Sequence, residues 1–394
     1  MSGESAVHET RLLSGILRVT THAAELPLDE LCGFGSRRSR RRGFVFVSKV
    51  LGKHWPVRPR MFQACCDRLA VRIADLKGPA VMVAMAETAT GLGHGIFESW
   101  LRHTGRNDLL FLHGTRYALA LPPALTFDEL HSHATRHRLY APTAADDRLL
   151  FNTAHTLVIV DDEMSTGATA ANLAAAYRQH NPALRQVIVV CLTDWLNDAS
   201  RAAVTRRVGV SVRFESLLRG TYSFEPDQAF DPGPPPFVDS NDQDKTYCLP
   251  ANFGRVGLRT ELQLNESALV AEANLLPGTR LLVLGTGEFH YPAFRLARWL
   301  ELQGWDVMFQ STTRSPLLVD GDLNSVLEFV DNYHEGIPNF LYNVVDRHYD
   351  RVLVGYETDP LPTEHRLCEI LGACGISFGI PASSVIEPLL IERS

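Results

Sequence analysis

The chain has 394 residues, of which 45% are hydrophobic and 21% are charged, and its formal net charge is −7 at pH 7. This composition is that of a globular protein long enough for two domains, and the acidic balance argues against a general nucleic-acid binder. The sequence has no apolar run of the ~18 residues that span a bilayer, no secretory-signal pattern and seven scattered cysteines without metal spacing, so it predicts a soluble cytoplasmic protein with reduced thiols.

The first half of the chain alternates apolar strand patterns with amphipathic helix patterns. Strands are predicted at 43–50, 79–86, 108–113, 156–162 and 185–195. Helices are predicted around 60–75, 94–103, 168–179 and 198–207. Such alternation predicts a mostly parallel sheet with helices on both faces. An arginine-rich run, SRRSRRR at 36–42, could bind nucleic acid or a phosphate-rich ligand, although most such runs are solvated loops.

The proline-rich segment 225–247 interrupts this rhythm and is typical of a linker or a covering loop. A second α/β pattern follows it, with strands at 280–289, 305–316 and 350–358 and a helix at 291–304. The sequence therefore predicts one domain over residues 1–228, a linker over 229–247 and a second domain over 248–394.

The stretch LVIVDDEMSTGATAANL at 157–173 is an apolar strand that ends in two acids, Asp161 and Asp162. Ser165, Thr166, Gly167 and Thr169 then turn the chain into an alanine-rich helix. A strand end, a small-residue loop and a helix N-terminus together present unpaired backbone N–H groups to an anion. The two acids beside this phosphate-binding loop are therefore predicted to bind hydroxyl groups, a metal ion or both.

Two further loops are predicted at the same edge of the sheet, where ligands collect in open α/β folds. The small residues of AETATGLGHG at 86–95 would let backbone amides approach an anion closely. The polar segment 114–150 is predicted to be a lid or disordered. It contains Arg116 and the pair His131 and His133, which are candidate cationic donors; a zinc site is the alternative for the histidines.

An apolar strand, two acids and an S/T-x-G-x-T loop resemble the phosphoribosyl-pyrophosphate (PRPP) signature of type I phosphoribosyltransferases. The resemblance implies that Asp161 and Asp162 bind the ribose hydroxyls and that the 5′-phosphate is held by Ser165, Thr166, Gly167, Ala168 and Thr169. It also implies a pyrophosphate loop formed by Glu87, Thr88, Ala89, Thr90 and Gly91. Since 114–150 matches the family's mobile hood in position, the catalytic candidates are Arg116, His131, His133 and Asp162.

Displacement of pyrophosphate from C1′ develops positive charge on the ribose and negative charge on the leaving group. Catalysis then depends on positioning, charge stabilisation and exclusion of water, with Mg²⁺ carried mainly by PRPP and not by direct protein ligands. Purine-salvage members of the family often have an aspartate at the position of Ser165, where it can act as a base toward the purine. Serine does not easily do this, so a hypoxanthine-type substrate is not favoured.

The segment FVSKVLGKHWPVRP at 46–59 resembles, in placement, the hood segment of orotate-type members, which contacts the nucleobase. Lys49, Lys53 and His54 would then face the base. A turn with exposed lysines is the alternative.

The string TRSP at 313–316, together with LGTGEFHYPAFRLARWLE before it, resembles the TRSP domain that follows phosphoribosyltransferases of bacterial tellurium-resistance-associated gene clusters. SKVLGKH, MAETATGLG, HSHATRH and DDEMSTGAT are similar to the same group, so the resemblance covers nearly the whole chain. It implies a role in making a nucleoside-like metabolite during the stress response.

Two motifs follow strands of the second domain and should share one crevice. Backbone amides of Gly285, Thr286 and Gly287 form an anion nest, and Glu288 could bind a sugar hydroxyl or act as a base. Arg314 offers a planar fork for phosphate, with Thr313 and Ser315 as hydroxyl donors. We predict a second site here for a phosphorylated metabolite; turn residues with a helix-capping box are the alternative.

The sequence as a whole predicts a cytoplasmic, Mg²⁺-dependent phosphoribosyltransferase that exchanges pyrophosphate and a nitrogenous base at C1′ of PRPP, in either direction. The alternatives are a PRPP-sensing regulator without turnover and a nucleotide-binding assembly protein. The expected partners are PRPP and a base or nucleotide, with no membrane or nucleic acid. The resemblance also implies two further kinds of partner, a second copy of the chain in a homodimer and other enzymes of the same gene cluster.

Overall fold

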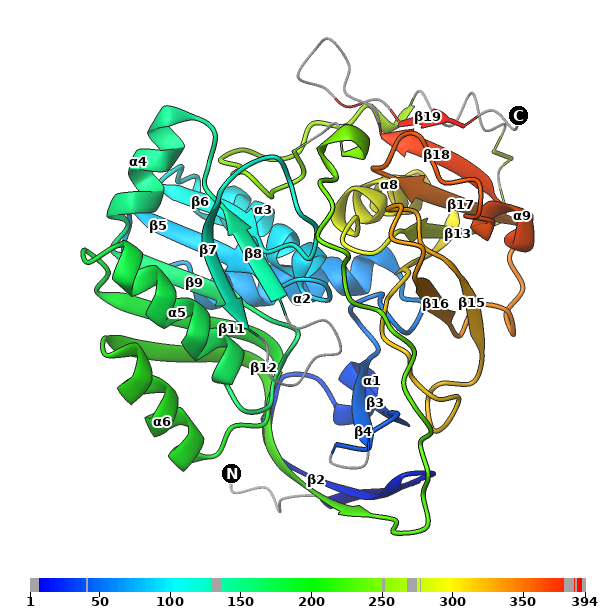
Figure 1. Ribbon diagram of the computed structural model, residues 1–394, viewed down its shortest axis with the longest axis horizontal. Helices are drawn as coiled ribbons and strands as arrows, with labels where there is room; N and C mark the ends of the chain where they lie inside the picture. Colours follow the sequence, from blue (N-terminus) through cyan, green and yellow to red (C-terminus); the bar gives the residue numbers. More distant parts are fainter. Residues whose placement is uncertain are drawn as a thin grey trace.

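The computed structural model describes residues 7–39, 42–128, 136–249, 252–267, 275–276, 278–378, 386 and 388–391. The first half forms a sheet with the strand order β1-β2-β12-β11-β9-β5-β6, in which β10 also pairs with β11 (Figure 1). From β12 to β6 the neighbouring strands are parallel to one another. Strand β2 is antiparallel to β12, and β1 is antiparallel to β2. The strands are β1 Val7–Leu12, β2 Gly15–Ala24, β5 Ala80–Ala84, β6 Leu109–His113, β9 Thr156–Val160, β10 Glu163–Met164, β11 Gln186–Asp194 and β12 Ser211–Pro226.

Helices cover both faces of this sheet. Helices α2 (Pro59–Arg72) and α3 (Thr90–Thr104) pack on one face, and α4 (Ala145–Thr153), α5 (Ala168–His180) and α6 (Asp198–Val208) pack on the other. Successive residues of a strand point to opposite faces, so Val158 and Val160 join one buried cluster while Leu157 and Ile159 join a second. The predicted parallel sheet with helices on both faces is confirmed.

Two segments contain pairings or elements that the sequence did not predict. The strand expected at 43–50 forms as β4 (Phe44–Ser48), but it pairs with β3 (Cys32–Ser36) after the short helix α1 (Leu28–Leu31), outside the central sheet. The segment expected to be a lid or disordered contains a hairpin of β7 (Pro123–Asp128) and β8 (Arg136–Tyr140) as well as α4. His131 and His133 lie outside the described residues.

The second half forms a sheet with the order β14-β13-β17-β18-β19, of which the first four strands are parallel. Helix α8 packs on the face toward α2 and α3, and the β15–β16 hairpin and α9 pack on the other. The bounds are β13 Arg280–Gly285, α8 Tyr291–Leu302, β14 Asp306–Ser311, β15 Val326–Val330, β16 Pro338–Tyr342, β17 Arg351–Tyr356, α9 Leu367–Leu371, β18 Cys374–Phe378 and β19 Pro388–Leu390, with a 3-10 turn, η1, at Thr246–Cys248. The second α/β unit is therefore confirmed.

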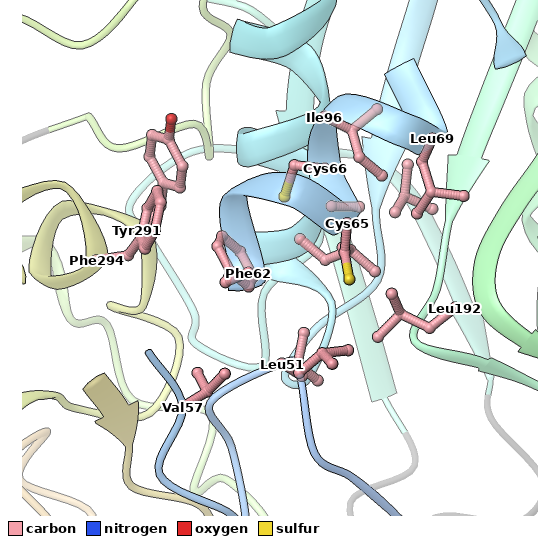
Figure 2. Packing of buried hydrophobic residues seen from close by; sticks show 14 of the residues in the cluster. Leu51, Val57, Phe62, Cys65, Cys66, Leu69, Ile96, Leu192, Tyr291 and Phe294 are labelled. Carbon is pink, nitrogen blue, oxygen red and sulfur yellow. The ribbon is translucent and has the colours of Figure 1, made fainter. Parts of the chain in front are cut away.

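The two halves share one apolar core. The rings of Phe62 in α2 and Phe294 in α8 lie 4.5 Å apart, and Figure 2 shows both beside Tyr291, with Leu192 of β11 further into the first half. The segment that precedes β13 also crosses between the halves, because Leu258 pairs with β6 of the first sheet. Burial of these side chains removes a large apolar area from water and holds the halves together. In the described part of the chain, no helix is long and apolar enough to cross a membrane.

Gly91, in the first turn of α3, lies directly against the second half. An ideal Cβ on this residue would be 1.6 Å from Nδ1 of His290. The His290 ring has little freedom to move, because its Nε2 lies 3.2 Å from the Gly52 carbonyl oxygen and its face packs 4.8 Å from the Phe309 ring. No side chain larger than that of glycine fits here without a shift of the packing.

We expect Gly91→Ala to lower the free energy of unfolding by about 3 kcal/mol, the upper end for overpacking in a dense core. Chemical denaturation of the full chain measures the effect. Gly114→Ala is the matched control, since its Cβ would meet its nearest neighbour at 3.7 Å, an ordinary contact. Equal stability of the two variants would contradict the close packing of α3 on the second half.

Candidate active site

A polar cavity of about 190 Å³ opens where the carboxyl ends of strands from both sheets meet. Loops that follow β5, β6 and β9 reach it from the first sheet, and the segment after β14 reaches it from the second. Its lining comprises Arg37, Arg42, Val45, Phe46, His54, Met85, Ala86, Glu87, Thr88, Arg116, His137, Asp161, Asp162, Glu163, Met164, Ser165, Thr166, Gly167, Ala168, Thr169, Ala170, Val238, Arg314, Ser315, Pro316 and Leu317.

The two acids stand at the end of β9, as the sequence predicts. The Asp161 backbone N–H donates to the Val190 carbonyl oxygen (3.0 Å), and the Asp162 carbonyl accepts from the Leu192 N–H (3.1 Å). The Asp162 N–H also donates to Oδ1 of Asp161 (3.0 Å). Sheet pairing thus fixes the backbone of both acids, which are half-buried at the cavity wall.

The loop after these acids turns into α5 through Gly167. This residue has φ of 70° and is the N-cap of α5; a Cβ here would lie 2.6 Å from Cγ2 of Val204. Glycine is therefore required both by the left-handed backbone and by the space. Gly167 has no side chain to cap the helix, and the Ala168 N–H donates to the Thr166 hydroxyl (3.3 Å). The N-terminus of α5 thus lies at the cavity beside the Ser165 and Thr166 hydroxyls, an arrangement that suits an anion.

Glu87 is the centre of a buried ionic group that joins both halves. Nζ of Lys53 lies 2.9 Å from one carboxylate oxygen of Glu87, and Nε of Arg314 lies 3.7 Å from the other. Burial alone would raise the pKa of Glu87, but these two cations hold it below its ordinary value. Of the predicted pyrophosphate loop, Glu87 and Thr88 line the cavity.

The rest of that loop turns away from the cavity toward the second half. Ala89 is buried in the apolar cluster that also contains Leu157 and Ile159 of β9. The Thr90 hydroxyl donates to the Glu288 carbonyl oxygen (3.1 Å), and Gly91 packs on His290. These residues position the loop and do not line the cavity.

The three residues predicted to face the base lie in different surroundings. Lys53 is 1% exposed and donates to the Gly287 carbonyl oxygen (2.7 Å) as well as pairing with Glu87. Lys49 pairs with Asp322 (2.9 Å), away from the cavity lining. His54 does line the cavity; burial and the Lys53 charge lower its pKa to about 3, so its ring is neutral at pH 7.

Further lining residues were not among the site residues predicted from the sequence. Arg37 and Arg42 of the arginine-rich run line the cavity, and Nη1 of Arg42 lies 3.3 Å from the Ser165 hydroxyl while Nη2 pairs with Glu163. His137 of β8 lines it too. In the sequence, His137 occupies an odd-numbered position like His131 and His133, and this pattern was a signal that could have grouped it with them.

Arg116, a predicted catalytic residue, lies at the cavity and is 5% exposed. Its backbone N–H donates to Oε1 of Glu288 (2.7 Å), and the Thr115 hydroxyl donates to Oε2 (2.6 Å). Arg255 lies 3.0 Å from Glu288 and forms two bonds to Glu357 of 2.6 and 2.7 Å. The cluster of Arg255, Glu288 and Glu357, hereafter the interdomain cluster, thus sets the position of Arg116.

The residues predicted to form a second-domain site divide into two groups. The Gly287 N–H donates to the Thr312 hydroxyl (2.9 Å), so the two motifs lie side by side as expected. Arg314 and Ser315 line the shared cavity. The others, Gly285, Thr286, Gly287, Glu288 and Thr313, are buried among protein partners at the domain interface.

The sequence matches two family models. The model described as a phosphoribosyl transferase matches residues 31–221, and the model described as the TRSP domain C-terminal to it matches residues 253–371. The chain belongs to the phosphoribosyltransferases, a class of pentosyltransferases. Both matched ranges lie within the predicted domains, and the cavity lies between the phosphoribosyltransferase domain and the TRSP domain. No curated protein matches the chain.

Solved structures similar to the phosphoribosyltransferase domain include adenine phosphoribosyltransferases. That of Trypanosoma brucei, in complex with AMP, pyrophosphate and ribose-5-phosphate, is 12% identical; the match covers 51% of this chain and 83% of that one, with a TM-score of 0.35. That of Leishmania tarentolae is 15% identical and covers 49% and 85%, with a TM-score of 0.34. That of Giardia lamblia, with 9-deazaadenine, is 16% identical and covers 41% and 80%, with a TM-score of 0.28.

Proposed function

We propose that this phosphoribosyltransferase uses PRPP and Mg²⁺ to exchange pyrophosphate and a nitrogenous base at ribose C1′, in either direction, in the synthesis of a nucleoside-like metabolite of the bacterial stress response. The observation that carries this proposal is the cavity itself. One space is lined by two adjacent acids, the N-terminus of α5 and the buried arginines Arg116 and Arg314. A ribose with a phosphate at one end and a pyrophosphate at the other needs these three groups.

The acids suit the ribose and the helix suits the 5′-phosphate. Carboxylate oxygens of Asp161 and Asp162 accept hydrogen bonds from the 2′- and 3′-hydroxyls, which orients the ring. The N–H groups of the first turn of α5 and the hydroxyls of the 165–169 loop hold the phosphate. The pyrophosphate then extends toward Glu87, Thr88 and Arg116, with His131 and His133 proposed as further donors from the hood.

The base fits the apolar part of the cavity wall. Val45, Phe46 and Leu317 line it there, and the Phe46 ring is held by stacking on Trp195 at 4.5 Å. A planar base packed on these side chains is shielded from water, and exclusion of water protects the cationic ribose in the transition state. The neutral ring of His54 at the same cavity can donate to or accept from the base.

The residues of the site fit a Mg²⁺ ion that arrives with PRPP. Within the described residues, no group of three or more His, Cys, Asp or Glu side chains could hold a metal ion. Mg²⁺ in phosphate-binding sites keeps most of its ligands as water and substrate oxygens, with one or two carboxylates. When bound, the ion neutralises charge on the pyrophosphate, and Asp161 or Asp162 would contribute an oxygen ligand.

Titration calorimetry of the full chain with PRPP and Mg²⁺ tests this proposal. We expect a dissociation constant in the micromolar range, weaker binding of ribose 5-phosphate, and pyrophosphate release when the correct base is added. Absence of PRPP binding by folded protein in the presence of Mg²⁺ would overturn the proposal. Tight PRPP binding without pyrophosphate release across a base panel would favour the regulator instead.

A further inference from the structure

The TRSP segment that reaches the cavity is held firmly by both domains. Thr313 pairs with Phe340 of β16, and the Leu317 N–H donates to the Tyr342 hydroxyl (2.7 Å). Leu317 also forms a bridge with Arg37 of the phosphoribosyltransferase domain. The residues between these anchors therefore enter the cavity in a defined position.

The guanidinium of Arg314 is fixed within this segment from three sides. It lies 4.7 Å from the centre of the Tyr117 ring, its Nε lies 3.7 Å from Glu87 and its Nη1 lies 3.5 Å from the Val238 carbonyl oxygen. Arg314 is 6% exposed, and what exposure it has is toward the cavity. An arginine ordered in this way has little conformational freedom left to lose when it binds a ligand.

The charge around Glu87 is not balanced by the protein groups of this contact. One carboxylate, that of Glu87, forms the ion pairs of both Lys53 and Arg314, while Glu288 acts on the two cations only from beyond ion-pair distance. Buried charges need counter-charges, because the low dielectric of the interior makes an uncompensated ion costly. By contrast, the β9–α5 loop presents acids and hydroxyls. The more anionic end of a two-ended ligand therefore belongs beside Arg314.

We propose that the TRSP domain completes the phosphoribosyltransferase cavity and that Arg314 is its ligand-binding residue, contacting the pyrophosphate group of PRPP. This inference rests on the proposed function. The planar fork of arginine binds two phosphate oxygens at once, which a lysine cannot reproduce. The TRSP domain thus acts in the same reaction as the first domain, and a separate second-domain reaction is not needed to explain its motif.

Binding of two ligands that differ only in the pyrophosphate group tests the inference. PRPP and ribose 5-phosphate, each with Mg²⁺, are titrated into the full-length wild type, Arg314→Gln and Arg314→Lys. We expect Arg314→Gln to weaken PRPP binding by about 10- to 100-fold and Arg314→Lys by about 3- to 10-fold, with ribose 5-phosphate binding changed by less than about 2-fold. Arg366→Gln, which removes an arginine paired with Glu369 on the surface of the TRSP domain, is the control and should leave both affinities unchanged.

The outcomes separate the inference from the proposed function. Wild type that binds neither ligand overturns both. Wild type that binds PRPP, with the same PRPP affinity in Arg314→Gln, overturns only the role of Arg314. An equal loss of both ligands in a folded variant also overturns it, because the effect would then be structural. If Arg314→Gln does not fold, Arg314→Lys keeps a partner for Glu87, and the same comparison of ligands decides.

Discussion

Asp161→Asn/Asp162→Asn is expected to weaken PRPP binding by at least ~100-fold, since each substitution removes charged hydrogen bonds of ~1.5 kcal/mol or more to a ribose hydroxyl. Asparagine keeps the shape of aspartate, and its side-chain oxygen can still accept the N–H of residue 162 that now donates to Asp161. The sheet bonds of the backbone do not involve the lost charges. Binding should therefore fall without a comparable loss of stability.

Calorimetry with PRPP and with ribose 5-phosphate measures the effect. Both ligands contain the ribose, so both affinities should fall together, unlike the selective loss expected for Arg314 variants. Asp146→Asn/Asp147→Asn removes another adjacent pair of acids, in the first turn of α4 and outside the cavity lining, and should leave both affinities unchanged. If the variant at 161 and 162 bound ribose 5-phosphate as the wild type does, the ribose would have to lie elsewhere.

Removal of the arginine of the interdomain cluster should cause the largest loss of stability. We expect Arg255→Met to lower the free energy of unfolding by about 3–5 kcal/mol, the cost of leaving buried charges without their partner. The side chain of Arg255 is 4% exposed and those of Glu288 and Glu357 are 1% exposed, so water cannot replace the lost bonds. Arg366→Met, at a pair on the surface, should leave the free energy of unfolding close to that of the wild type.

The pH dependence of this loss follows from Glu288. Burial would raise its pKa, but Arg255 with His113 and the Thr115 and Arg116 donors holds it below the ordinary value. In the wild type Glu288 therefore adds stability above its unfolded pKa, and this contribution disappears as pH falls through the lower folded pKa. Without Arg255 the largest cause that lowers the pKa of Glu288 is lost, so burial raises the folded pKa relative to the wild type and the contribution of Glu288 to stability at neutral pH shrinks.

The destabilisation of Arg255→Met should accordingly be greatest at neutral pH and shrink as pH falls below about 5, where carboxyl groups take up protons. Denaturation of wild type and variant at a series of pH values measures the difference. Arg255→Met/Glu288→Gln/Glu357→Gln removes the unpaired charges and should recover much of the stability at pH 7. A deficit independent of pH, or no recovery in the triple variant, would show that packing and not charge controls this interface.

Local sequence patterns predicted many of the helices and strands of the protein. The period of apolar residues predicted the strands β5, β6, β9 and β11 and the helices α2, α3, α5, α6 and α8, because burial of one face or both faces leaves a regular pattern. The strands β1, β2 and β12 of the same sheet were not predicted. The acids and small-residue loop after β9 were also predicted from sequence. In this loop the strand end, the Gly167 turn and the helix N-terminus are consecutive in the chain, so neighbouring residues alone make the cradle.

The surroundings of that cradle come from long-range packing. Lys53 appeared suited to a base, but a carboxylate 34 residues further along pairs with it in the interior. Arg314 was assigned to a separate site, yet it enters the first domain's cavity because α8 packs against α2 and α3 and brings the end of β14 to the end of β5. Glu288, predicted to act on a ligand, instead receives bonds from Thr115, Arg116 and Arg255. Contacts of this kind join residues that are far apart in the chain. They depend on how the side chains of two sheets pack together, and the pattern of residues within one strand or helix does not predict that packing.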